Sequence, residues 1–337
     1  MLNLRRSVVG VVAMLLVSGV TGCGGGDSSS PTGPTAVETA TPGATATGTS
    51  PYGVCAVTAS DAMLPPTFVV AMIPEGDPLY GIFQKCMKVF GTSLLAFDTY
   101  PDDTMVHVAT VTAEYLDNNE DGIVDNMAVN MALQQNHASF FLGEDAPGGN
   151  AEPPQVAAIK DRREVQYIRH RTDIFYGPGS FHVDSSNPGG TWCGTPCGQR
   201  GDGEVLEHVP ELIQKAGYAT AYPSDFGPVR GSTLGKALEA ARGGYCCEGD
   251  PAVYPESAWY IERGHPYDGN FVEYFFWGLA THLGMLGDVS PGVCAQIADA
   301  WKACTRADFI AKDTILHSLL TNSLFSLPQR APNGSYR

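Results

Sequence analysis

The spacing of hydrophobic residues along the chain predicts more helices than strands. Apolar side chains that recur every three or four positions indicate amphipathic helices, and short apolar runs bounded by turn residues indicate strands. We therefore expect helices over residues 79–89, 102–116, 127–136, 205–216, 232–242, 270–286 and 308–324, and one more that begins at Pro291. Strands are expected over residues 93–97, 139–142 and 165–169. Few short strands among many helices predict a helix-rich α+β fold.

Capping residues predict where several of these helices begin and end. Asp102 and Asp103 supply N-cap chemistry for the first long helix, and Ser232 caps a later one. Gly217 is expected to end the helix over 205–216, because glycine readily adopts the left-handed conformation that closes a helix.

The first residues of the chain have the pattern of an export signal. Two arginines, at positions 5 and 6, precede an apolar run over residues 8–17 that is too short to span a bilayer. The run ends in Val20-Thr21-Gly22-Cys23, which resembles the lipobox of bacterial lipoproteins. The resemblance implies a signal peptide over residues 1–22 and a lipid on Cys23. The alternative is an ordinary signal peptide followed by an unrelated cysteine.

A segment of small and polar residues follows this cysteine. Residues 23–53 contain almost no large apolar side chain, so they cannot bury enough surface to offset the entropy of ordering. We expect a disordered tether that joins the lipid to one globular domain over residues 54–337, with an internal boundary or long functional loop at 177–203. The expected partner is a membrane outside the cytoplasm. Gly24, by resemblance to known sorting signals, favours the outer membrane or cell surface.

Acidic residues outnumber basic ones in the chain. There are 20 Lys and Arg against 36 Asp and Glu, a formal net charge of −16. Loss of the two N-terminal arginines leaves 18 basic residues and a net charge near −18. Such a charge argues against nucleic acid as a partner and suits a protein that binds divalent cations, although it is also consistent with solubility alone.

Eight cysteines remain besides Cys23, an even number that is typical of disulfides in an exported protein. We expect one bridge between Cys55 and Cys86, and another between Cys294 and Cys304. The remaining four leave two arrangements open. Cys193 and Cys197 either close a small loop or pair with Cys246 and Cys247, and these four sulfurs also suit a zinc ion.

The most specific chemical motif is an acidic loop between two predicted helices. Side chains with oxygen atoms occupy positions 1, 3, 5 and 9 of the loop; they are Asp117, Asn119, Asp121 and Asp125. A glycine follows at position 6. Ile123 is at position 7, where the backbone carbonyl would bind the ion. The loop resembles that of the EF-hand family, including its dockerin and thrombospondin-repeat relatives, which implies a Ca²⁺ site within a helix–loop–helix unit.

One position of this loop departs from the family pattern. Position 12 is Ala128 instead of a bidentate glutamate, so water or another residue must replace that ligand, or the affinity is weak. The alternative interpretation is an acidic surface turn. A site closed by protein oxygens is expected to be structural, not catalytic.

A second group of chemical residues lies on the helix expected over 205–216. Glu204, Glu207, His208 and Glu211 form one stripe of this helix, and apolar residues form the opposite face. The alternative is an amphipathic helix with a solvated acidic face. Pro210 also argues against the site, because a proline at the first helical position would leave residues 204–208 outside the helix.

This stripe resembles the helix of zincin peptidases with its residue types exchanged. Glu207-His208-x-x-Glu211 stands where that family has H-E-x-x-H, and Glu273 on a later apolar helix matches the distant glutamate ligand of gluzincins. The resemblance implies that Glu207, Glu211 and Glu273 are metal ligands and that His208 is the general base. Three carboxylates depart from the family and favour Mn²⁺, Mg²⁺ or Ca²⁺ over Zn²⁺. The resemblance itself implies Zn²⁺, and the second metal is expected to be Zn²⁺ or Mn²⁺.

The body from Lys88 onward also resembles an uncharacterised family of exported proteins. The similar segments are Val209–Gly217, Tyr222-Pro223, Ala258–Tyr260 and Glu273-Tyr274. The resemblance implies one continuous domain and no particular reaction. Two hypotheses follow. The chain is a lipid-anchored, calcium-binding and metal-dependent hydrolase, or it is a non-catalytic surface protein stabilised by calcium and disulfides.

Overall fold

The computed structural model describes residues 52–143, 163–169, 203–245, 253–263, 266–288 and 291–336. It also describes the single residues at positions 156, 159 and 251. Several sequence predictions lie outside these residues: the signal peptide, Cys23, the tether up to residue 51, residues 177–202 of the expected boundary, and Cys193, Cys197, Cys246 and Cys247. The last two tether residues, 52 and 53, are described. The Tyr52 ring stacks on that of His137 at a centroid distance of 3.5 Å.

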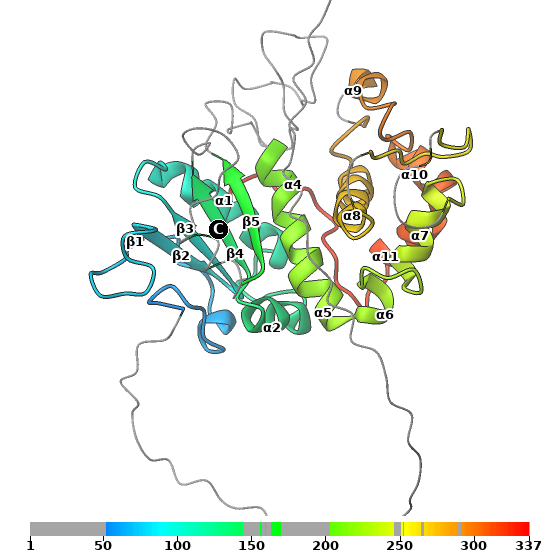
Figure 1. Cartoon of the computed structure of the whole chain (residues 1–337). Helices are drawn as coiled ribbons and strands as arrows, with labels where there is room; N and C mark the ends of the chain where they lie inside the picture. Colours follow the sequence, from blue (N-terminus) through cyan, green and yellow to red (C-terminus); the bar gives the residue numbers. More distant parts are fainter. Residues whose placement is uncertain are drawn as a thin grey trace, which may run out of the picture.

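A five-stranded mixed sheet forms one side of the molecule (Figure 1). Its strands stand in chain order: β1 (Ala71–Met72), β2 (Lys85–Val89), β3 (Thr92–Ala96), β4 (Ser139–Gly143) and β5 (Val165–Arg169). The first three strands are antiparallel, whereas β3, β4 and β5 are parallel. The strands expected at 93–97, 139–142 and 165–169 are therefore confirmed, and β5 is an edge strand.

Strand β2 corrects the prediction of a helix over 79–89. The first half of this segment forms turns, and the second half pairs with β3 through a hairpin whose connection is Phe90-Gly91. A Cβ on Gly91 would lie 2.2 Å from the carbonyl oxygen of Asn130, so only glycine fits there. Pairing with β3 and burial on both faces override the helical spacing of the apolar residues.

Both faces of the inner strands β3 and β4 are buried, which matches the apolar runs in these strands. In β3, successive side chains alternate between two clusters: Leu94 contributes to the main core, and Leu95 belongs to a smaller cluster on the other face. The predicted Cys55–Cys86 disulfide is present in this smaller cluster. It joins the chain entry to β2.

Two helices and a loop connect β3 to β4. The helices are α1 (Asp102–Leu116) and α2 (Met127–Gln135), as predicted. Pro101, and not an aspartate, occupies the N-cap of α1; Asp102 instead forms an ion pair of 2.7 Å with Lys85. The N-cap of α2 is Asn126, whose side chain accepts a hydrogen bond from the N–H of Val129.

The helix expected over 205–216 begins earlier and continues further. It comprises α4 (Gly203–Leu212), a π-helical segment η2 (Ile213–Tyr218) and α5 (Ala219–Ala221). Gly217 is not the residue that ends it. A Cβ on Gly217 would lie 2.7 Å from a methyl carbon of Val129, so this glycine allows η2 to approach α2 closely.

Pro210 lies inside α4, which corrects the interpretation that it begins the helix. A proline has no N–H, so the carbonyl of the residue four positions earlier loses its helical partner. That carbonyl, of Leu206, accepts a hydrogen bond of 3.2 Å from the hydroxyl of Tyr115 on α1. The replacement bond lets Glu207, His208 and Glu211 remain on one helix.

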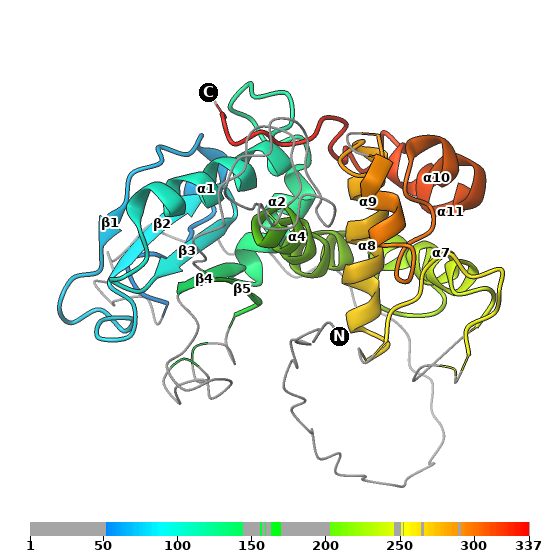
Figure 2. The ribbon, with the colours of Figure 1, turned by 90° about the horizontal axis from the view of Figure 1, so that it is seen from above.

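The C-terminal half is helical and lies on the other side of α4 from the sheet (Figures 1 and 2). It contains α6 (Pro223–Phe226), α7 (Thr233–Ala241), α8 (Gly269–His282), α9 (Pro291–Gln296), α10 (Arg306–Lys312) and α11 (Thr314–Leu320). Ser232 caps α7 as predicted. The expected helix over 270–286 ends four residues early, at His282, and the predicted Cys294–Cys304 disulfide is present.

The helix expected over 308–324 is two helices that meet at Asp313. Asp313 ends α10 and caps α11 by accepting a hydrogen bond from the N–H of Leu316. Its carboxylate also accepts hydrogen bonds from Trp259 and Tyr274, at 3.0 and 2.5 Å. These long-range contacts fix the break, which helical periodicity alone does not reveal.

One main core connects the sheet side with the helical side. It runs from Leu94 and Phe140 in the sheet, through Leu212, to Phe275 and Trp301 in the helical half. The expected α+β class, rich in helix, is therefore confirmed. Among the described residues, no helix has both the length and the apolar character needed to cross a membrane.

Candidate functional site

The polar face of α4 gathers three chemical side chains in one place. Glu207, His208 and Glu211 each offer a ligand atom, and these atoms lie within 4.8 Å of one another. His208 Nδ1 lies 2.8 Å from Glu211 Oε2. Glu211 is only 3% exposed, whereas His208 is half-buried. The stripe is therefore not a solvated acidic face. The side chain of Glu204 lies outside the described residues.

Glu273 joins these residues from α8, which packs against α4. The pKa of Glu273 is raised to about 10, first by burial and then by the negative charges of Glu211 and Glu207 and a hydrogen bond with Glu211. The structure thus brings together the four residues that the sequence singled out on two helices more than 60 positions apart. We refer to Glu207, His208, Glu211 and Glu273 as the acidic centre.

Two further residues belong to the surroundings of the acidic centre and were not predicted. Gln166 on the edge strand β5 donates a hydrogen bond to Glu211 Oε2, and its Nε2 also lies 3.0 Å from His208 Nδ1. Glu262, which precedes α8, adds negative charge that acts on Glu273. A lone glutamine in a short strand gives no sequence signal, because only the packing of β5 on α4 places it here.

One buried atom of the acidic centre lacks the partner that its burial requires. Glu211 Oε1 has no hydrogen-bond partner among the described residues. A buried carboxylate oxygen is costly to leave unsatisfied, and close carboxylates repel one another unless a proton or cation lies between them. The donor set of three carboxylates and one imidazole fits Mn²⁺ or Zn²⁺. The residues present therefore fit the divalent ion that the zincin resemblance implies.

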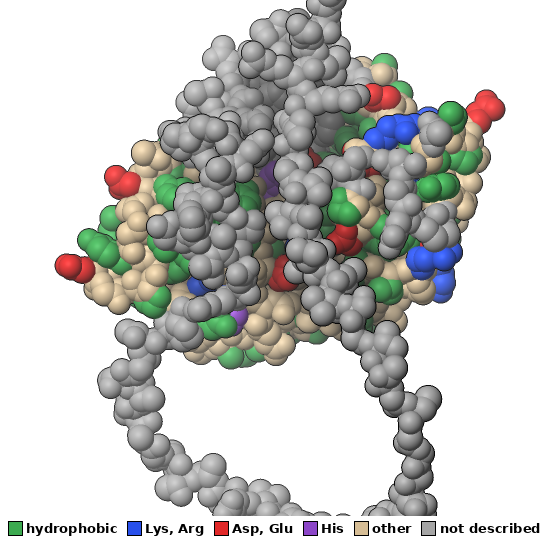
Figure 3. All heavy atoms as spheres, viewed as in Figure 1, with side chains coloured by type: hydrophobic (Ala, Val, Ile, Leu, Met, Phe, Trp, Pro, Cys, Tyr) green, Lys and Arg blue, Asp and Glu red, His purple; other side chains and the backbone are tan. Residues whose placement is uncertain are grey.

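The surface around this region is shown in Figure 3. Acidic side chains and histidine side chains are visible near the middle of this face, beside residues drawn in grey.

The loop over residues 117–125, which we call the aspartate loop, is held by side-chain to backbone hydrogen bonds. Asp117 is fully buried, and its two carboxylate oxygens accept the N–H groups of Asp121 and Gly122, at 3.2 and 2.8 Å. Asn119 Oδ1 also accepts the N–H of Asp121, at 2.9 Å. Gly122 has φ +86°, the left-handed conformation expected at position 6 of such a loop.

The second half of the aspartate loop closes back on its first half. Asp121 accepts the N–H of Ile123, and Asp125 accepts the N–H of Asn118 at 2.7 Å. Burial raises the pKa of Asp125, and the negative charges of Asp117 and Asp121 contribute. The carboxylates of Asp117, Asp121 and Asp125 thus bind backbone N–H groups of the loop itself. Ala128, which offers no side-chain oxygen, is exposed.

A C-terminal segment, residues 329–336, lies against the aspartate loop and α1. The carboxylate of Glu114 accepts the N–H groups of Asn333, Gly334 and Ser335. The hydroxyl of Tyr336 donates a hydrogen bond to Asp117 Oδ2, the same oxygen that accepts Gly122 N–H. These contacts span more than 200 positions, and sequence analysis did not predict them.

Glu114 remains largely buried in this contact. Burial raises its pKa even though three backbone hydrogen bonds act in the opposite direction. Asn118 adds further connections, because its Oδ1 accepts the N–H groups of Gln329 and Arg330, each at 3.0 Å. The 329–336 segment therefore positions the first ligand residue of the aspartate loop.

Comparisons of the chain with protein-family models, with curated proteins and with solved structures found no match.

Proposed function

We propose that this chain is a metal-dependent, zincin-like hydrolase whose divalent ion is bound at the acidic centre. The observation that carries the proposal is the convergence of Glu273 from α8 with Glu207 and Glu211 from α4. Solvated acidic side chains would separate, whereas Glu211 is 3% exposed and keeps one oxygen without a partner among the described residues. A divalent ion is the simplest occupant that relieves both the repulsion and the missing contact.

Each residue of the acidic centre has a distinct role in this proposal. The carboxylates of Glu207, Glu211 and Glu273 hold the ion, which supplies Lewis-acid polarisation of a substrate oxygen when bound. His208 is the general base. A proton on His208 Nδ1 is donated to Glu211 Oε2, so Nε2 is the proton acceptor of this tautomer. Gln166 orients Glu211 from the sheet.

The proposal places a structural Ca²⁺ in the aspartate loop. Asp117, Asn119, Asp121 and Asp125 supply the side-chain oxygens, and Ile123 supplies its backbone carbonyl. The support is the set of hydrogen bonds from backbone N–H groups to these side chains, which holds the loop in a tight turn, together with α1 and α2 on either side. Ala128 leaves one coordination position for water.

The proposal also places the protein outside the cytoplasm, anchored to a membrane by a lipid on Cys23. The support comes from the lipobox-like residues before Cys23 and from the two disulfides, which are typical of oxidising compartments. Labelling of the expressed protein with a radioactive fatty acid, compared with Cys23→Ser, tests the anchor. Equal labelling of both would rule it out.

Metal analysis of the full chain tests the acidic centre. Protein stripped with chelator and equilibrated with Mn²⁺ or Zn²⁺ should bind one ion that is lost in Glu211→Gln and in Glu273→Gln. The affinity should fall by more than about 100-fold, since loss of a surrounding partner alone costs about 10–100-fold. Glu256→Gln, a change at an exposed glutamate, is the matched control. Unchanged binding in both centre variants would contradict the site.

A second candidate function is a non-catalytic binding protein. It is supported by several features that make the structure rigid: two disulfides, the aspartate loop and the 329–336 segment. Hydrolysis of a quenched-fluorescent peptide library separates the candidates. Metal-dependent cleavage that His208→Ala removes supports the enzyme, whereas metal binding without any cleavage supports the second candidate.

A further inference from the structure

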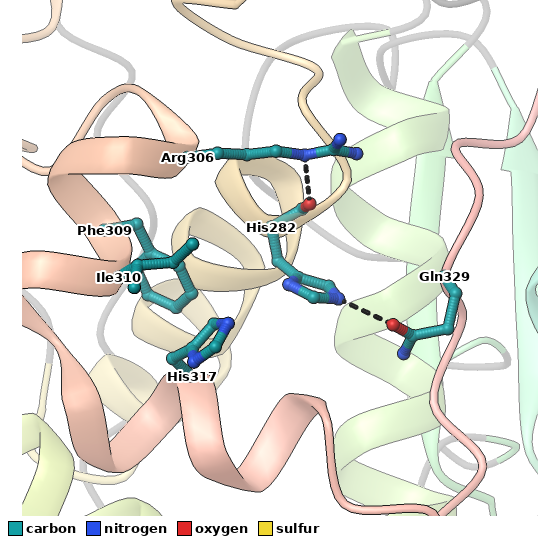
Figure 4. Close-up of a pocket in the computed structure, with 6 residues that line it drawn as sticks. All are labelled: His282, Arg306, Phe309, Ile310, His317 and Gln329. Atoms are coloured by element: carbon teal, nitrogen blue, oxygen red, sulfur yellow. Dashed lines mark hydrogen bonds between the residues drawn. The ribbon is translucent and has the colours of Figure 1, made fainter.

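A hollow of about 210 Å³ lies in the helical half, among α8, α10, α11 and the start of the 329–336 segment. It is lined by His282 at the end of α8, by Arg306, Phe309 and Ile310 of α10, by His317 of α11, and by Gln329 (Figure 4). Among the described residues that line it there is no carboxylate, although the chain carries a net charge of −16. The two histidines are its distinguishing chemical groups.

The tautomer of His282 is fixed by Gln329. The amide nitrogen of Gln329 donates to the carbonyl oxygens of Leu320 and Leu327, at 3.1 and 2.9 Å, so its oxygen must face the imidazole. That oxygen lies 3.0 Å from His282 Nε2, which must therefore carry the proton. In the neutral ring, the lone pair is then on Nδ1.

His317 faces His282 across the hollow. The ring centroids lie 5.9 Å apart at an interplanar angle of 63°. A nitrogen of each ring is turned toward the other ring (Figure 4). Phe309 packs edge-on against His317 at a centroid distance of 6.0 Å, which supports the ring on its other side. Two imidazoles held on separate helices thus present nitrogens to one space.

We propose that His282 and His317 form a two-histidine site for a borderline transition-metal ion such as Zn²⁺ or Cu²⁺. Metal–nitrogen bonds of about 2.0–2.1 Å allow one ion to bridge two nitrogens at this ring separation. A histidine ligand usually donates its other N–H to a fixed acceptor, and Gln329 is that acceptor for His282. Water completes the coordination.

The same geometry argues against two other classes of ligand. An anion held between the two rings needs an N–H from each of them, but the nitrogen of His282 that is not bonded to Gln329 presents a lone pair. Calcium and magnesium need several oxygen ligands, and the lining residues supply no carboxylate. Imidazole nitrogen is instead a preferred ligand of zinc and copper.

Copper binding to the full chain, purified without an added histidine tag, tests the proposal. The measurement is made in the His208→Ala background, which removes the imidazole of the acidic centre. Electron paramagnetic resonance should show Cu²⁺ bound to two imidazoles, and only one should remain in His317→Ala or in His282→Ala. Zinc affinity should fall by more than about 100-fold in these two variants, and by about 10–100-fold in Gln329→Ala.

Controls distinguish the loss of this metal site from a general effect of removing a histidine or of unfolding the protein. His137→Ala changes another half-buried histidine and should leave both readouts unchanged. Circular dichroism of each variant shows whether it is folded, and both histidines are only partly buried, so their loss should be tolerated. A one-imidazole spectrum in the His208→Ala background, or equal zinc affinity with and without His317, would overturn the proposal.

Discussion

The aspartate loop and the acidic centre hold negative charge in different ways. In the loop, the carboxylates of Asp117, Asp121 and Asp125 each accept backbone N–H groups, so each charge has a nearby partial positive charge. In the acidic centre, Glu273 faces Glu211 and Glu207, and burial strengthens their repulsion. The loop therefore keeps its shape without a cation, whereas the acidic centre needs a proton or a cation.

This difference shows that acidity alone does not identify one kind of metal site. Acidic side chains that are oriented by backbone hydrogen bonds can stabilise the fold whether or not an ion is bound. Acidic side chains that repel one another favour the binding of a positive ion, but they lower the stability of the ion-free protein. The same chemical change, carboxylate to amide, should therefore have opposite effects at the two places.

The largest expected effect is the destabilisation caused by Asp117→Asn. The new amide cannot accept all three hydrogen bonds that Asp117 now receives, from Asp121, Gly122 and Tyr336. The free energy of unfolding in chelator should fall by about 2–4 kcal/mol, measured by urea titration. Asp121→Asn is the matched control, because this exposed carboxylate should cost less than about 1 kcal/mol. Equal losses would contradict the comparison.

Glu273→Gln should change the free energy of unfolding in the opposite direction. Near neutral pH, Glu273 must take up a proton when the metal-free chain folds, and an amide needs none, so the metal-free protein should be stabilised by about 1–2 kcal/mol. Urea titration in chelator measures this, with Glu256→Gln as the exposed control. A loss of stability as large as that of Asp117→Asn would show that the two regions do not differ.

The pH dependence of stability sharpens the same contrast. The folded pKa of Glu273 is raised from 4.5 to about 10, so between these values the folded chain holds a proton that the unfolded chain has released. The unfolding free energy of metal-free protein should therefore fall as pH rises, by up to about 1.4 kcal/mol per pH unit. Denaturant titrations at about pH 6 and about pH 7 measure this. The slope should be smaller in Glu273→Gln, and parallel curves would refute the assignment.

The smallest expected effect is that of Tyr336→Phe. The change removes the hydroxyl that donates to Asp117 and leaves the ring packed near Phe68 and Phe90. It should cost about 1 kcal/mol of stability and weaken calcium binding modestly, as measured by calorimetry. Tyr80→Phe, at an exposed tyrosine, provides the comparison. No change in either quantity would mean that the 329–336 segment does not support the loop.

Features that lie close together in the sequence could be predicted, because their physical causes are local. Helices α1, α2 and α7, strands β3 to β5 and two disulfides follow from periodicity, capping residues and cysteine number. The alternating residues of the aspartate loop likewise need only a short chain segment. The acidic centre could be proposed from the spacing on α4 and the unusual glutamate on an apolar helix.

The remaining features depend on contacts between distant segments. Strand β2 forms because β3 pairs with it, and Gly217 is required by a methyl group of Val129, not by a helix end. The break at Asp313 depends on Trp259 and Tyr274. Gln166 carries no local signal at all. Tertiary packing decides each of these, so propensity and periodicity alone gave the wrong structure or none.

The position of the 329–336 segment has a consequence for the order of assembly. Its residues emerge from the ribosome more than 200 positions after Glu114 and Asn118, the residues that receive them. The sheet-side half can therefore collapse early, but its loop gains these hydrogen bonds only after the whole helical half has been translated. Contacts of such high sequence separation slow folding. A chain that stops before residue 329 lacks these contacts, so the state of the loop reports whether this segment has been made.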